Sequence, residues 1–113
     1  MNHRLRRVSE ILKRELGLLL AREVDFPVPL VTVSAVDLTP DLRKAHVFVS
    51  AIADPGQIEE ILRVLDAARP RLQSELAKRV IIKHTPHLHF RFDGSVERGT
   101  RVLGILDELG LAP

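Results

Sequence analysis

Three histidines stand close together in the last third of the sequence, and imidazole both ligates metals and contacts phosphate. They are His84, His87 and His89. Alternate side chains of a strand share a face, so His87 and His89 could offer two imidazoles to a zinc ion. Asp93 follows nearby, but nothing supplies a clear third and fourth ligand. We therefore favour exposed strand histidines among basic neighbours over a metal site, and we expect neither metal nor cofactor.

The residues that usually carry covalent or acid–base catalysis are absent or unpatterned. The chain has no cysteine, tyrosine or tryptophan, and it contains neither a phosphate-binding glycine loop nor a G-x-S-x-G motif. No His–Asp pattern distinguishes any of the serines considered: Ser9, Ser34, Ser50, Ser74 and Ser95. We therefore predict that the protein is not an enzyme. The lack of cysteine also fits a reducing cytoplasm.

Basic side chains are the most informative group, because they are unevenly distributed. Residues 1–23 carry six basic and three acidic side chains, residues 24–62 two and six, and residues 63–84 six and two, giving net charges of +3, −4 and +4. This segregation favours a polyanionic partner, with solvated helix faces as the alternative. Base stacking is expected to be minor, because Phe90 and Phe92 are predicted to be buried, so recognition should depend on phosphate and shape.

Two helical segments are predicted to position much of this charge. Residues 3–23 are amphipathic, and from Gln57 to about Arg79 a second apolar face continues through Pro70. A proline inside a helix removes a backbone N–H and clashes with the carbonyl four residues back. We therefore predict a bend within 67–71 that separates two helices. The N-terminus of the second helix, flanked by Arg69 and Arg71, would be an anion site.

Three extended segments complete the pattern. Leu30–Leu38 is rich in Val and Thr, Lys44–Ile52 alternates between apolar and polar residues, and His87–Asp93 alternates again with its apolar residues inward. The short turn between the first two makes them a hairpin. A last helix is predicted from Ser95 to about Leu109. The order α-β-β-α-(kink)-α-β-α predicts one α+β domain, with a three-stranded sheet covered by helices on one face.

This order and three stretches resemble the ribosome-binding factor A family, bacterial assembly factors of the small ribosomal subunit, over nearly the whole chain. The stretches are the arginine-rich first helix, "DLRKAHVFVS" (Asp41–Ser50) and "KHTPHLHFRFDGS" (Lys83–Ser95). The resemblance implies a type II KH-like fold, here a single RNA-binding domain over residues 1–113. KH domains usually hold RNA with a Gly-x-x-Gly loop, which this chain lacks. The family has a helix–kink–helix around Ala-x-Gly, matched here by Ala68, Arg69 and Pro70, with proline in place of glycine.

The resemblance also implies a function and partners. It implies a non-enzymatic factor that binds the immature small subunit and its rRNA, supports maturation of the rRNA leading (5′) end, and matters in cold adaptation. An assembly GTPase is a candidate partner, and we expect a cytoplasmic monomer. A membrane partner is not expected, because the apolar run Leu16–Ala21 is too short to span a bilayer. With the charge pattern, the predicted RNA-binding surface is Arg4, Arg6, Arg7, Arg69, Arg71, Lys78, Arg79 and Lys83, extended by His87, His89 and Arg91.

Two other binding functions remain as alternatives. One is a general RNA-binding module, and the other is a protein-interaction module that docks through the apolar face of the first helix or the edge of the hairpin. A core role for that helix face is favoured, because a small sheet needs a covered face to fold alone. Salt dependence separates the classes, since polyanion binding weakens steeply with salt and apolar docking does not.

Overall fold

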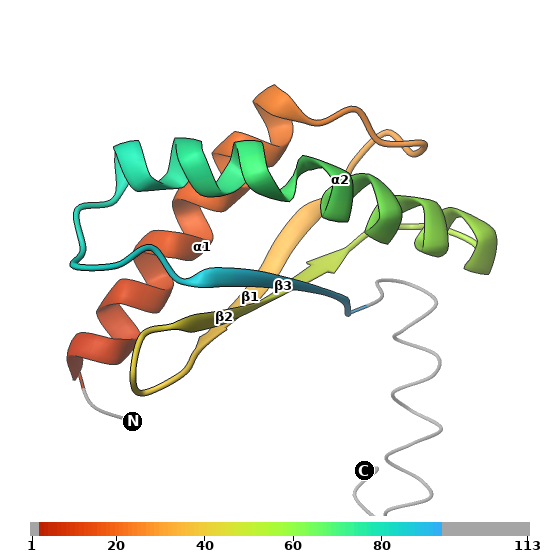
Figure 1. Cartoon of the computed structure of the whole chain (residues 1–113). Helices are drawn as coiled ribbons and strands as arrows, with labels where there is room; N and C mark the ends of the chain where they lie inside the picture. The colour runs from red at the N-terminus through yellow and green to blue at the C-terminus, as the bar shows by residue number, and fades with distance from the viewer. Residues whose placement is uncertain (1–2, 94–113) are drawn as a thin grey trace, which may run out of the picture.

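The computed structural model describes residues 3–93, which form two helices and three strands (Figure 1). The elements are α1 (His3–Glu23), β1 (Thr32–Leu38), β2 (Lys44–Ser50), α2 (Pro55–Arg79) and β3 (His87–Phe92). The predicted α+β class and the order of these elements are confirmed. The last helix predicted from the sequence lies outside the described residues. Neither α1 nor α2 is both long and apolar enough to cross a lipid bilayer.

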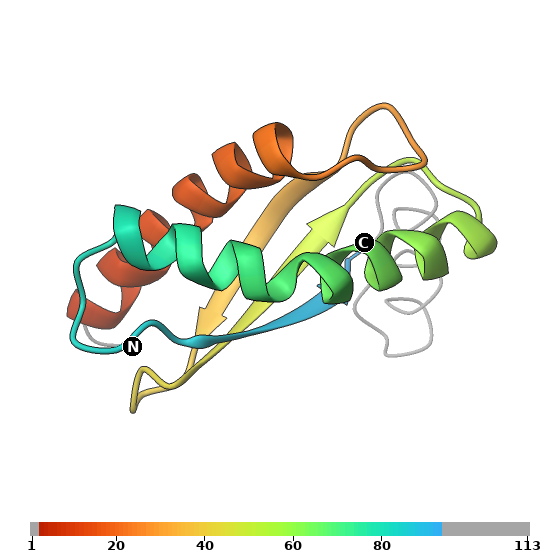
Figure 2. The same ribbon diagram turned by 45° about the horizontal axis from the view of Figure 1, so that its top comes forward.

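The strands form one sheet in the order β1-β2-β3. β1 and β2 are the predicted antiparallel hairpin, with an irregularity between Val33 and Ala35. β3 pairs with β2 in parallel, and α2 provides the crossover that a parallel pair requires. Both helices lie on the same face of the sheet (Figure 2), as predicted. The opposite face, called the outer face below, is covered by no element within residues 3–93.

The core lies between the helices and the inner face of the sheet. Leucines spaced three or four residues apart line α1, and an equivalent stripe runs the length of α2, as helical periodicity requires. Alternate residues of β2 and Leu88 of β3 complete the core. Phe90 and Phe92 lie at the margin of the core and are only half-buried, so they are less buried than predicted. β3 is an edge strand, so its inner face is covered less completely than that of the central strand.

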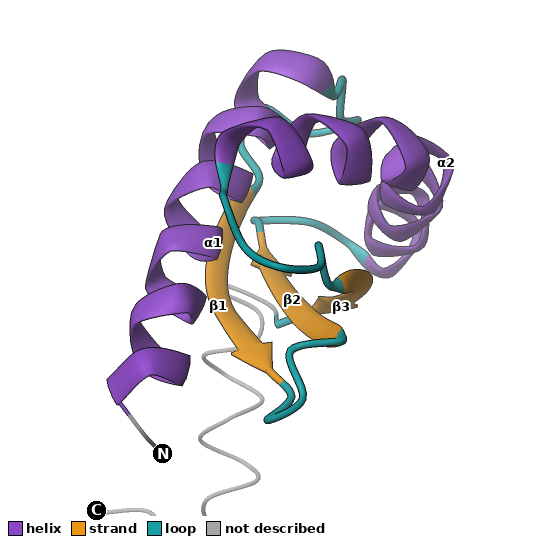
Figure 3. Ribbon diagram, turned by 60° about the vertical axis from the view of Figure 1, so that its left-hand side comes forward, coloured by secondary structure: helices purple, strands orange, loops and turns teal. Residues whose placement is uncertain are grey.

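α2 passes through Pro70 without interruption. The predicted division into two helices is therefore wrong, although the axis of α2 changes direction near its middle (Figure 3). Proline removes one N–H, and a helix can relieve the ring's clash by bending rather than ending. Both halves are held to the same core, because Leu65 and Leu72 are each fully buried on either side of the proline. Packing thus outweighs the local cost of the proline.

Candidate nucleic-acid interface

Exposed cations from three separate segments gather at one end of the molecule. Figures 1 and 2 place the first turns of α1, the hairpin between β1 and β2, and the loop between α2 and β3 at this end. Their basic side chains are exposed, and the ion pairs found within residues 3–93 involve other residues. We call the following six residues the basic end: Arg4, Arg6, Arg7, Arg43, Lys44 and Lys83.

The hairpin that carries Arg43 is held by its own side chains. The Thr39 hydroxyl donates to Asp41 Oδ1 at 2.7 Å, and the backbone N–H of Arg43 donates to the same oxygen at 3.1 Å. These hydrogen bonds, that from Thr39 first, lower the pKa of Asp41. Leu42 has φ 63°, a left-handed conformation that is strained for a residue with a β-carbon. Local bonds therefore hold the backbone at Arg43, a residue outside the predicted RNA-binding surface.

Arg69, predicted to contact RNA, turns toward the sheet instead. It forms an ion pair with Asp66, one turn earlier in α2, and its guanidinium carbon lies 5.8 Å from the centroid of the Phe90 ring. Its side chain is 28% exposed. Cation–π contact and an ion pair both favour this inward position. Arg69 is therefore directed toward Asp66 and Phe90 rather than outward to a ligand.

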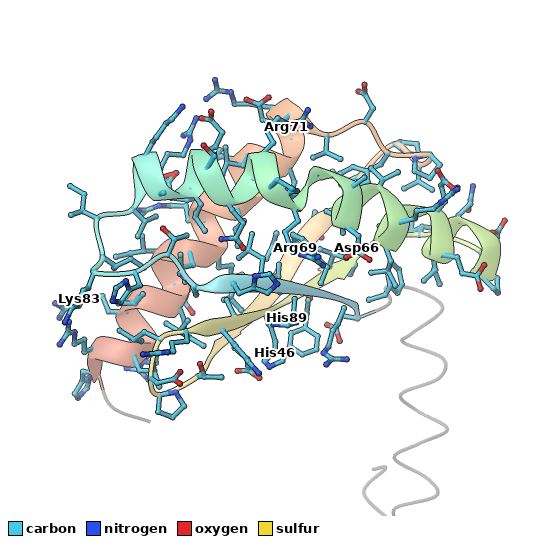
Figure 4. All side chains as sticks on the ribbon, viewed as in Figure 1. His46, Asp66, Arg69, Arg71, Lys83 and His89 are labelled. Carbon is cyan, nitrogen blue, oxygen red and sulfur yellow. The ribbon has the colours of Figure 1, made fainter. Side chains whose placement is uncertain are left out.

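Arg71 lies on the opposite side of α2 (Figure 4) and contacts the end of α1. Its Nη2 donates a hydrogen bond to the carbonyl oxygen of Glu23, the last residue of α1. A helix C-terminus has unpaired carbonyls and a partial negative charge, so an arginine is well placed there. No new helix begins at Pro70, because the N–H groups after it are within a continuous helix. The predicted anion site at that position therefore does not form.

The two basic residues at the end of α2 also have partners. Lys78 Nζ lies 3.3 Å from Glu75 Oε1, in an exposed pair of the kind that contributes little. Arg79 Nη1 lies 3.6 Å from Glu15 Oε2, and both side chains are mostly buried. That second pair joins α2 to α1, so Arg79 serves the fold. Lys78 remains exposed beside the loop that carries Lys83.

The outer face of β2 and β3 carries rings and cations in register. The cross-strand partners are Lys44 with His87, His46 with His89, and Phe48 with Arg91. The ring centroids of His46 and His89 are 5.4 Å apart, and those of His87 and His89 are 4.8 Å apart (Figure 4). His87, His89 and Arg91 thus share a face, as predicted. His46 and Phe48 were not predicted, because the parallel register that brings them there is not visible in the sequence.

The surroundings of His89 favour its neutral form, and the histidines of the described residues are not grouped as metal ligands. Burial lowers the pKa of His89, and the positive charges of His87, His46, Lys44 and Arg69 lower it further. Within residues 3–93, no three histidine, aspartate or glutamate side chains are placed to hold a metal ion. His84 lies apart from His89, in a hollow lined with Arg43, Gln73, Thr85 and His87. The metal alternative thus gains no support from the described geometry.

Gln73 of α2 positions the start of β3. Its side-chain Nε2 donates to the carbonyl of Pro86 at 3.0 Å, and its Oε1 accepts from the backbone N–H of Leu88 at 2.7 Å. These bonds occupy the free edge of β3, where no other strand within residues 3–93 pairs. His87 lies between the two anchored residues. Gln73 therefore controls where the imidazoles of β3 stand relative to the helices.

The structure therefore divides the predicted RNA-binding residues into three groups. Arg4, Arg6, Arg7 and Lys83 lie exposed at the basic end, together with two cations that were not predicted. His87, His89 and Arg91 lie on the outer face. The remaining four contact other parts of the protein: Arg69, Arg71, Lys78 and Arg79.

Comparisons with known proteins agree with this architecture. The family model described as Ribosome-binding factor A matches residues 4–106. A Ribosome-binding factor A from Nitrosococcus oceani is 42% identical over 106 residues, covering 93% of this chain and 84% of that protein. The crystal structure of ribosome-binding factor A from Thermus thermophilus has a TM-score of 0.70 and 33% identity, covering 77% of this chain and 93% of that one. A homology model of the Thermus thermophilus ribosome binding factor A, fitted into a cryo-EM map of its complex with 30S, has a TM-score of 0.56 and 36% identity, covering 71% of this chain and 89% of that one.

Proposed function

The chain belongs to the ribosome-binding factor A family, and on this premise we propose that it binds the small ribosomal subunit during assembly. The proposed role is non-catalytic, because the protein would act by holding rRNA rather than by changing a covalent bond. Support comes from the fold shared with a Thermus thermophilus protein that has been placed in a 30S complex. As the family resemblance suggests, the proposal includes support for 5′-end maturation of the rRNA, a role in cold adaptation, and action in the cytoplasm.

The observation that carries the proposal is the basic end. Three segments far apart in the sequence contribute cations that form no ion pair within residues 3–93. Arginine and lysine side chains release counterions when they bind phosphates, which provides affinity without requiring a particular sequence. The positive end of the α1 dipole adds to the field around Arg4, Arg6 and Arg7. An array of exposed cations of this kind suits the phosphate backbone of folded RNA.

The test replaces Arg4, Arg6 and Arg7 together with glutamine and measures sedimentation of the protein with purified immature and mature small subunits. We expect weaker binding to immature subunits, with the salt slope of binding reduced by about 2 to 3 if all three contact phosphates. A matched control replaces three exposed arginines elsewhere: Arg14, Arg22 and Arg63. It removes the same charge, so its binding should change much less.

Two outcomes would argue against the proposal. If both triple variants lose the same affinity, net charge rather than the basic end attracts the RNA. If the parent protein binds immature subunits, mature subunits and unrelated folded RNA alike, a general RNA-binding module is the better interpretation. For 5′-end maturation, cells that lack the protein should accumulate 5′-extended rRNA in the cold. The basic-end variant should fail to correct that defect, while the control variant corrects it.

A further inference from the structure

No element within residues 3–93 covers the outer face of β2 and β3 (Figures 1 and 2), and aromatic and imidazole rings lie on this face. His46 and Phe48 of β2 and His89 of β3 are half-buried, and the rings of His46 and His89 lie against each other. Phe48 in particular is a large apolar ring on a face that the core does not use. Such residues on an uncovered sheet face are typical of an interaction surface.

The rings alternate with cations in a regular pattern. Lys44 is paired with His87 at one end of the β2–β3 seam, and Arg91 with Phe48 toward the other. From Lys44 to Phe48 the strand rises about 13 Å, at roughly 3.3 Å per residue. A sheet face with two or three half-buried rings over this distance has room for two or three stacked bases, as in sheet-based RNA-binding domains.

The carboxylates nearby limit the path that RNA could take. Asp37 of β1 is the cross-strand partner of His46, and Asp93 accepts a hydrogen bond from the Ser34 hydroxyl at 3.0 Å. Both would repel phosphates that crossed β1 or extended beyond the end of β3. RNA that follows the boundary between β2 and β3 can therefore place its bases on the rings and its phosphates beside Lys44 and Arg91.

We propose that the outer face of β2 and β3 is a stacking platform for two or three unpaired bases of RNA, formed by His46, Phe48 and His89. The proposal rests on the proposed function for the class of ligand, and it assigns a second mode of contact to the same protein. The basic end would hold the phosphates of folded RNA, whereas the platform would hold bases that have left a helix. Stacking tolerates any base, because each base has a flat face.

The test measures binding of the full 113-residue chain to three RNAs: an unpaired adenylate hexamer, an abasic hexamer of the same backbone, and a twelve-base-pair duplex. The variants are Phe48→Leu and His89→Gln, which remove a ring but keep an apolar or polar side chain. Phe26→Leu is the matched control, since Phe26 is also half-buried but precedes β1. We expect the platform variants to weaken hexamer binding about five-fold or more, without affecting the duplex.

Several results would overturn the platform. These are unchanged hexamer affinity in both platform variants, an equal loss in the Phe26→Leu control, or equal affinity of the parent for adenylate and abasic hexamers. If platform variants lose subunit binding but keep hexamer binding, the face contacts a protein instead. If they lose hexamer binding and still sediment with subunits, the platform stands and so does the proposed function. If the parent binds the hexamer but no subunits, only the proposed function fails.

A measurement on the unaltered protein covers the case in which a variant does not fold. The imidazole Hε1 resonances of His46 and His89 should shift when the adenylate hexamer is added, because stacked bases produce ring currents. The resonance of His3, in the first turn of α1, reports contact at the basic end separately. Shifts at His3 alone, with none at His46 and His89, would contradict the platform.

Discussion

Replacing Gln73 with alanine tests how β3 is held in place. The side chain of Gln73 bridges α2 and β3 with two hydrogen bonds, of 3.0 Å to the Pro86 carbonyl and 2.7 Å from the Leu88 N–H. Alanine leaves both of these backbone groups without their partner. Leu88 is 0% exposed, so water has restricted access to its N–H. The variant should therefore lose more than the net value of two surface hydrogen bonds.

The expected cost follows from the environment of the two bonds. A typical intramolecular hydrogen bond contributes about 0.5–1.5 kcal/mol net, and a buried group left without a partner costs about 1–3 kcal/mol. Both bonds are partly buried, so we expect Gln73→Ala to lower the free energy of unfolding by about 2–3 kcal/mol. For a domain of this size, each kcal/mol corresponds to about 4–8 °C in Tm.

Urea and thermal unfolding of the purified protein measure this cost, with Gln57→Ala as the control. The Gln57 side chain also accepts a hydrogen bond, from the Asp54 N–H at 3.0 Å, but it lies in the exposed capping box of α2. Its loss should cost about 1 kcal/mol or less. A Gln73→Ala variant no less stable than Gln57→Ala would refute the reasoning, because it would mean that water replaces the carboxamide without penalty.

Three further predictions concern α2 and the outer face. Pro70→Ala should raise the free energy of unfolding, measured in urea, by about 1–2 kcal/mol. The site is exposed, and alanine restores an N–H that can bond to the Asp66 carbonyl. An unchanged free energy of unfolding would mean that core packing requires the bend. Asp54→Ala should lower the free energy of unfolding by about 1 kcal/mol in the same assay, because it removes the N-cap of α2. Stability should also fall below about pH 6.5, because the pKa of His89 is lowered in the folded protein, chiefly by burial and then by His87, so the unfolded state binds a proton first. The contribution of neutral His89 to stability is fully present above about pH 6.5 and is lost as the pH falls through the lowered pKa. The Tm of His89→Gln should therefore differ less between about pH 7.5 and about pH 5.5 than the Tm of the parent. An equal difference in Tm would contradict the assignment.

The secondary structure could be predicted from the sequence alone, because it depends on local periodicity. The leucine spacing of α1 predicts an amphipathic helix, and the alternation of Lys44 to Ser50 predicts β2, since each pattern reflects one buried face. The ends of β1 and β2 were less predictable. Leu30 and Ile52 were included in strands, but both are exposed just beyond them, because an apolar side chain alone does not require a strand partner. Membership of the family was also predictable, from residues 41–50 and 83–95.

The path of α2 shows where local reasoning fails. Pro70 correctly predicted a disturbance, yet the sequence could not tell whether the helix ends or bends. That outcome depends on the leucines on both sides, which are held by the same core. Burial of several such residues outweighs a penalty of about 3 kcal/mol for one proline.

The candidate interface was decided by the tertiary structure. The sequence did not indicate partners for Arg71 and Arg79. In the structure they contact α1, through the carbonyl of Glu23 and the carboxylate of Glu15. Arg43 lies in a segment of net negative charge, and the hairpin nevertheless brings it to the basic end. Composition describes charge along the chain, whereas a binding surface depends on which charges remain unpaired in space.

The outer face required one further fact, the parallel register of β2 and β3. His46 and His89 are separated by the whole of α2 in the sequence, and they meet only because the crossover sets that register. A shift of one residue would turn His89 inward and Leu88 outward, because side chains alternate between the faces of a strand. The sequence by itself therefore determined the elements and the family, and the packing of distant segments determined which side chains are available to RNA.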